Sequence, residues 1–81
     1  MTKHDKLLNR FRQNPRNVRF DEIDTLLSGL GFSKRMRGSH ATYTKGEYRI
    51  TVPDRKPFLL PVYVKHILAI LDEMGNSETG E

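Results

Sequence analysis

The chain has 81 residues, with 14 lysines and arginines against 10 acidic residues, and it contains no cysteine. This length fits one small domain, and a chain without cysteine forms neither a disulfide nor a thiolate metal site. No apolar stretch approaches the roughly 20 residues of a membrane-spanning helix, and the first residues do not resemble a signal peptide, so we expect a cytoplasmic protein.

The first third of the chain has the pattern of two helices. Residues 2–13 carry a short apolar stripe that ends at Phe11, and Pro15 stops this segment because a residue before proline is disfavoured in a helix. From residue 20 to residue 30, apolar side chains recur at helical spacing, and acidic ones fill the first turn, where the helix dipole favours them. Gly31 then provides a natural C-terminal stop.

Beyond the second helix the apolar pattern changes to a period of two, which is typical of β-strands. It predicts strands at residues 32–37, 39–44 and 47–52, joined by turns at Gly38 and at Lys45-Gly46. The alternation divides the predicted sheet into a core face and an open face. Tyr48, Ile50 and Val52 are predicted to face the core. Phe32 and Met36 share one face of the first strand, and Ala41 and Tyr43 share one face of the second.

The last part of the chain is predicted as a loop, a helix and a polar tail. Residues 53–60 form the loop, and Pro61 opens the helix at the position where its missing amide costs nothing. Gly75 ends this helix, and residues 76–81 are predicted to be disordered. The order α-α-β-β-β-α implies one α+β domain, residues 1–75, in which a three-stranded antiparallel sheet carries the helices on one face.

Basic residues gather in the second half of the chain. Residues 33–65 contain eight lysines and arginines against two acids. Such a concentration of positive charge suits a polyanion such as nucleic acid. The alternative is a solvated basic surface that only keeps a small protein soluble.

Four short motifs, in this order along the chain, together resemble the HicA family of toxins from bacterial toxin–antitoxin pairs. The resemblance covers residues 20–74, most of the chain. The motifs are Gly31-Phe32, Gly38-Ser39-His40, Ile50-Thr51-Val52-Pro53 and the start of the final helix, Pro61-Val62-Tyr63-Val64-Lys65.

This resemblance implies a fold similar to the double-stranded RNA-binding domain and a ribonuclease activity on mRNA, as the toxin of a type II pair. It implies that His40, the histidine of the Gly-Ser-His motif, is catalytic, and that a HicB-type antitoxin inhibits the protein. The sequence departs from the family in two places. Many members have a second histidine soon after the Val-Pro pair, where this chain has Asp54, Arg55 and Lys56, and the predicted helix at residues 2–13 is an addition.

Proton transfer by a histidine suits RNA cleavage, because RNA supplies its own nucleophile in the 2′-hydroxyl and the unperturbed imidazole titrates near neutrality. If Ala41 and Tyr43 face the helices, His40 lies on the open face. Beside it, Gly38 lets a phosphate come close, and Ser39 can donate a hydrogen bond or simply form the turn. The cations that could neutralise phosphate charge are Arg35, Arg37, Arg55, Lys56 and Lys65.

Other functions stay open from the residues alone. His40 could be an incidental surface histidine on a module that binds RNA without cutting it, or the basic patch could recognise an acidic protein. Tyr43 and Tyr48 could stack on bases or pack in the core. No histidines and carboxylates have the spacing of metal ligands, so we expect neither a metal nor a cofactor.

Overall fold

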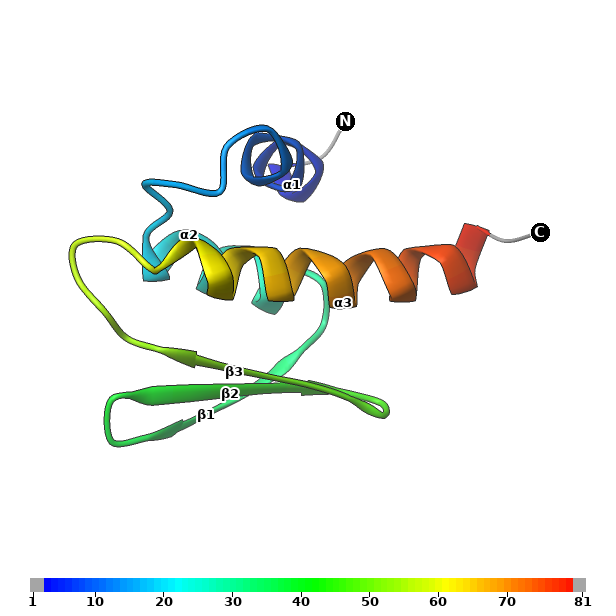
Figure 1. Ribbon diagram of the computed structural model, residues 1–81. Helices are drawn as coiled ribbons and strands as arrows, with labels where there is room; N and C mark the ends of the chain where they lie inside the picture. The colour runs from blue at the N-terminus through cyan, green and yellow to red at the C-terminus, as the bar shows by residue number, and fades with distance from the viewer. Residues whose placement is uncertain (1–2, 80–81) are drawn as a thin grey trace.

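The computed structural model describes residues 3–79 and has the predicted order of elements, α-α-β-β-β-α (Figure 1). The chain is therefore an α+β protein with a three-stranded antiparallel sheet in the order β1-β2-β3. Its elements are α1 (Lys3–Gln13), α2 (Phe20–Gly29), β1 (Ser33–Arg37), β2 (His40–Lys45), β3 (Tyr48–Pro53) and α3 (Pro61–Thr79).

The helices lie on one side of the sheet, in two layers. Figure 1 shows α2 and α3 next to the sheet and α1 on the far side of these two helices. The core fills the space between the layers, with Phe11 of α1, Leu27 of α2, Ile50 of β3 and Ile67 of α3 all buried. The second face of the sheet is covered by none of the described helices, and we call it the open face.

Both hairpins close through two-residue turns that begin with glycine. Gly38 and Gly46 have φ angles of 61° and 59°, a region that side chains with a Cβ rarely adopt. Because each glycine takes the first position of its turn, β2 begins at His40 and β3 at Tyr48. Both strands therefore start one residue later than the sequence predicts.

The end of α2 matches its prediction. Gly31 has a φ of 95°, its N–H bonds to the Ser28 carbonyl at 3.1 Å, and the Phe32 N–H bonds to the Leu27 carbonyl at 3.1 Å. This pair of bonds is the Schellman arrangement that satisfies the last carbonyls of a helix.

Met36 lies on the core-side face of β1, opposite the buried Ala41, but β1 is an edge strand and 46% of the Met36 surface is exposed. One prediction at the end of the fold is wrong. The last helix does not end at Gly75, since α3 continues to Thr79. Residues 76–79, predicted as disordered, are thus helical in their backbone, whereas residues 80 and 81 lie outside the described part, as does residue 2 of the first predicted helix.

Candidate nucleic-acid interface

The register of the two hairpins determines which side chains share the open face. Residues paired across antiparallel strands point to the same side, so each cross-strand row lies on one face. His40 is paired with Arg37 on one side and Pro53 on the other, and it is exposed. The open face therefore consists of the rows Arg37–His40–Pro53, Arg35–Thr42–Thr51 and Ser33–Thr44–Arg49.

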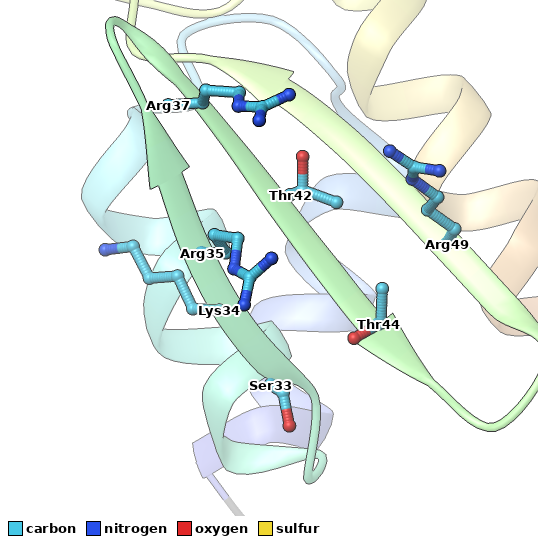
Figure 2. A pocket seen from close by; sticks show the side chains of 7 residues that line it. All are labelled: Ser33, Lys34, Arg35, Arg37, Thr42, Thr44 and Arg49. Carbon is cyan, nitrogen blue, oxygen red and sulfur yellow. The ribbon is translucent and has the colours of Figure 1, made fainter.

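A shallow groove of about 550 Å³ lies along this face. Figure 2 shows the guanidinium groups of Arg35 and Arg37, from β1, and of Arg49, from β3, around the central Thr42 of β2. Three cations thus surround a set of hydroxyl groups that can donate hydrogen bonds. The side chains that line the groove are Ser33, Lys34, Arg35, Arg37, Thr42, Thr44 and Arg49.

These arginines are available to a ligand. The described ion pairs join Arg10 to Glu22, Arg12 to Asp72 and Lys34 to Asp24, and none of these three involves an arginine of the open face. Exposed cations without a protein carboxylate can neutralise an incoming phosphate without first breaking an ion pair. The groove is therefore suited to a polyanion.

Lys34 differs from its arginine neighbours because it serves the fold. Its Nζ atom lies 2.9 Å from Asp24 Oδ1 and 5.5 Å from the centre of the Phe20 ring, both on α2. Burial alone would raise the pKa of Asp24, but hydrogen bonds from Lys34 and Tyr43, with the Lys34 charge, hold that pKa below its ordinary value. Lys34 thus ties the edge strand to α2.

Neither tyrosine of the sheet is placed to stack on a base. Tyr43 is fully buried, and its hydroxyl donates a 2.7 Å hydrogen bond to Asp24. Burial and this bond to a carboxylate raise the Tyr43 pKa above its usual range. Tyr48 packs against the core. No aromatic ring other than the His40 imidazole stands in the described rows of the open face, so base stacking has no platform there.

The turn before His40 is tied to the chain that follows β3. The Ser39 carbonyl accepts a 2.7 Å hydrogen bond from the Asp54 N–H. Gly38 and Ser39 are both exposed at this end of the sheet. The hydrogen bond brings the start of the 54–60 loop, which carries Arg55 and Lys56, next to the Gly-Ser-His segment.

The structure gathers some of the predicted site residues and separates others. Arg35, Arg37 and His40 share the open face, and Arg55 and Lys56 lie in the loop beside its His40 end. Lys65 is on α3, on the opposite side of the sheet (Figure 1). The sequence prediction omitted Arg49, although its outward place in the alternation of β3 was a signal that could have identified it.

Comparisons with family models, with curated protein sequences and with solved structures give no match to this chain. Within the described residues, no three histidine, cysteine, aspartate or glutamate side chains are grouped to hold a metal ion, and no helix there is long and apolar enough to cross a membrane. The residues of the open face are therefore the basis for a functional assignment.

Proposed function

We propose that this protein is an mRNA-cleaving endoribonuclease, the toxin of a HicA-type toxin–antitoxin pair with a fold similar to the double-stranded RNA-binding domain. The observation that carries the proposal is the position of His40, exposed beside Arg37 on a basic sheet face that no described helix covers. The open face holds single-stranded or locally open RNA, and His40 performs the proton transfer.

The reaction uses the 2′-hydroxyl of the RNA as its nucleophile. His40 removes the hydroxyl proton, the 2′-oxygen forms a bond to the adjacent phosphorus, and the bond from phosphorus to the 5′-oxygen breaks. The departing 5′-oxygen takes a proton from the imidazolium or from water, which leaves a cyclic phosphate and a 5′-hydroxyl. These reaction steps need no metal, because the substrate supplies the nucleophile and the histidine moves the proton.

Arg37 is the cation best placed to support this step. It is the cross-strand neighbour of His40, so a phosphate bound by its guanidinium lies within reach of the imidazole. Charge develops on the phosphoryl oxygens during the reaction, and a fixed guanidinium stabilises that charge. Arg35 and Arg49, farther along the groove, hold the flanking phosphates (Figure 2).

A HicB-type antitoxin would inhibit such an enzyme by covering the open face. Acidic side chains placed against Arg35, Arg37 and Arg49 would occupy the phosphate positions and exclude RNA.

A second function, RNA binding without cleavage, is favoured by one observation. Within residues 3–79, no hydrogen bond orients the His40 ring, whereas catalytic histidines are commonly held by a neighbouring acceptor. In this case the arginines bind the backbone, and His40 has no chemical role. The other alternative, a basic domain that recognises an acidic protein, uses the same cations.

The decay of a labelled mRNA in EDTA distinguishes these functions. We expect the wild-type protein to cut the RNA and His40→Ala to bind it equally well but cut it about 10²–10⁴-fold more slowly. His66→Ala, a change of an exposed histidine on α3, is the matched control and should cut normally. Binding by wild type without any cutting would favour the binding module, and equal cutting by His40→Ala would exclude the catalytic role of His40.

A further inference from the structure

A second cleft, of about 300 Å³, lies between the start of α2 and the loop of residues 54–60. Arg19 enters it from one side, and Arg55 and Lys56 enter it from the other. Phe20 and Pro57 give the cleft an apolar wall, and Asp21 is its one acidic lining residue. A volume at the lower end of small-molecule pockets, with an apolar wall beside several cations, fits one nucleotide, whose base is apolar on its faces and whose phosphate is anionic.

Backbone hydrogen bonds hold this cleft close to His40. Pro53 is the cross-strand partner of His40, and the Arg55 N–H bonds to the Pro53 carbonyl at 2.9 Å, which folds the chain back at Asp54. Two residues span at most about 7 Å, so the Arg55 backbone lies within that distance of Pro53. Arg55 therefore connects the His40 end of the open face with the cleft.

The far end of the same loop is fixed to the segment before α2. The Leu59 N–H donates a 2.8 Å hydrogen bond to the Val18 carbonyl, and the Leu59 side chain is buried. The loop thus crosses from the end of β3 to the start of α2 (Figure 1). It places the cleft near the same end of the sheet as His40.

The cations of the cleft are also available to a ligand. Arg19, Arg55 and Lys56 take part in none of the described ion pairs. The Arg19 charge does act on Glu22, but that carboxylate forms its ion pair with Arg10, at 2.5 Å. Three cations against Asp21 leave the cleft with a positive charge. Its preferred ligand is therefore an anion with an apolar part.

We propose that this cleft is a nucleotide subsite of the ribonuclease, in which an RNA strand leaving the open face past His40 places a flanking nucleotide. The proposal rests on the proposed function, because it assumes that RNA lies along the open face. RNA fits better than an acidic protein, since the apolar wall of Phe20 and Pro57 suits the face of a base and the cations beside it suit a phosphate. The substrate is then an extended single strand that contacts both the open face and the cleft.

The test is an NMR titration of the His40→Ala protein, which keeps the RNA intact, with a trinucleotide and with a decanucleotide. We expect both to shift the backbone amides of Arg35 and Arg49, and only the decanucleotide to shift those of residues 19–21, Arg55 and Lys56. If the open face responds and the cleft does not, the subsite is excluded and the proposed function stands. If neither RNA shifts the open face, the proposed function fails with the subsite.

Charge variants give a second, quantitative test in the same background. Arg55→Gln combined with Lys56→Gln should weaken the binding of the decanucleotide roughly tenfold and leave the affinity for the trinucleotide unchanged. Lys6→Gln, on α1 and away from both surfaces, should change neither affinity. Equal weakening of both oligonucleotides would show that the loop acts only through long-range charge and would overturn the subsite. The subsite would also be overturned if the amides of the cleft shifted with a polyglutamate peptide and not with RNA.

Discussion

Arg37 and His40 face each other directly across the first hairpin, on the side of the sheet that no described helix covers. Side chains paired in this way have Cβ atoms about 4.5–5.5 Å apart, so the guanidinium and the imidazole can contact the same phosphate. The turn between them is only Gly38 and Ser39, and the Asp54 N–H holds it in place. This pair is the structural basis of the proposed reaction.

Arg37→Gln should lower kcat far more than it raises KM. If the guanidinium stabilises charge in the transition state, its removal costs about 10²–10³-fold in kcat. Arg49→Gln is the matched comparison, because it removes the same charge from the same face two strands away from Arg37 and should act mainly on KM. Steady-state cleavage of a labelled RNA measures both constants. If Arg37→Gln raised KM and left kcat unchanged, Arg37 would only bind the RNA and would not stabilise the transition state.

The affinity of the open face for RNA should fall steeply with salt, and that dependence should weaken as arginines are removed. Each phosphate contact to a single strand contributes about 0.7 to the slope of log K against log salt concentration. Arg35→Gln combined with Arg49→Gln should therefore reduce the slope by about 1.4. Fluorescence anisotropy in the His40→Ala background measures it, with Lys6→Gln as the control. An unchanged slope would mean that the groove does not hold phosphates.

Local patterns in the sequence were sufficient to predict the elements and the orientation of the strands. Helical spacing identified α2 and α3, and period-two alternation put Ala41 and Tyr43 on the face opposite His40. The structure shows that the face of Ala41 and Tyr43 is the buried one. Both signals work because a helix and a strand repeat over a few residues, so a short window contains the whole pattern.

Local sequence patterns could not predict the properties that depend on residues far apart in the chain. The partner of His40 follows from the register, which the two-residue turns set, and a one-residue shift in the strand starts changes every pair. The exposure of Met36 follows from the edge position of β1, which has a neighbouring strand on one side only. The cleft depends on the hydrogen bond between Leu59 and Val18, and no local pattern relates these two residues.

The free energy of unfolding should decrease as the pH is lowered below about 5. Asp24→Asn should make the free energy of unfolding less dependent on pH in this range. The pKa of Asp24 is below its ordinary value of 3.8 in the folded protein, so the ionised form stabilises the fold. That stability is present above the ordinary pKa and is lost as the pH falls through the lower folded pKa. Denaturant titrations between pH 7 and pH 3 measure it. Glu47→Gln, an exposed change in the second turn, should keep the wild-type dependence.

Gly38→Ala and Gly46→Ala should destabilise the fold equally, but only Gly38→Ala should lower the cleavage rate. The two glycines have φ angles of 61° and 59°, and a Cβ added at either would meet no atom within 4 Å, so the cost is backbone strain alone. That strain is about 1–2 kcal/mol for a residue other than glycine. Thermal unfolding should show matching decreases in Tm for the two variants.

The difference between the two glycines is their distance from the proposed chemistry. Gly38 begins the turn that precedes His40, whereas Gly46 begins the turn at the other end of β2. A strained first turn displaces His40 relative to Arg37, and small displacements of catalytic groups cost up to about 10²-fold in rate. Cleavage at a temperature where both variants are fully folded separates this effect from stability. Equal rates in the two variants would show that catalysis does not depend on the geometry of the Gly-Ser-His turn.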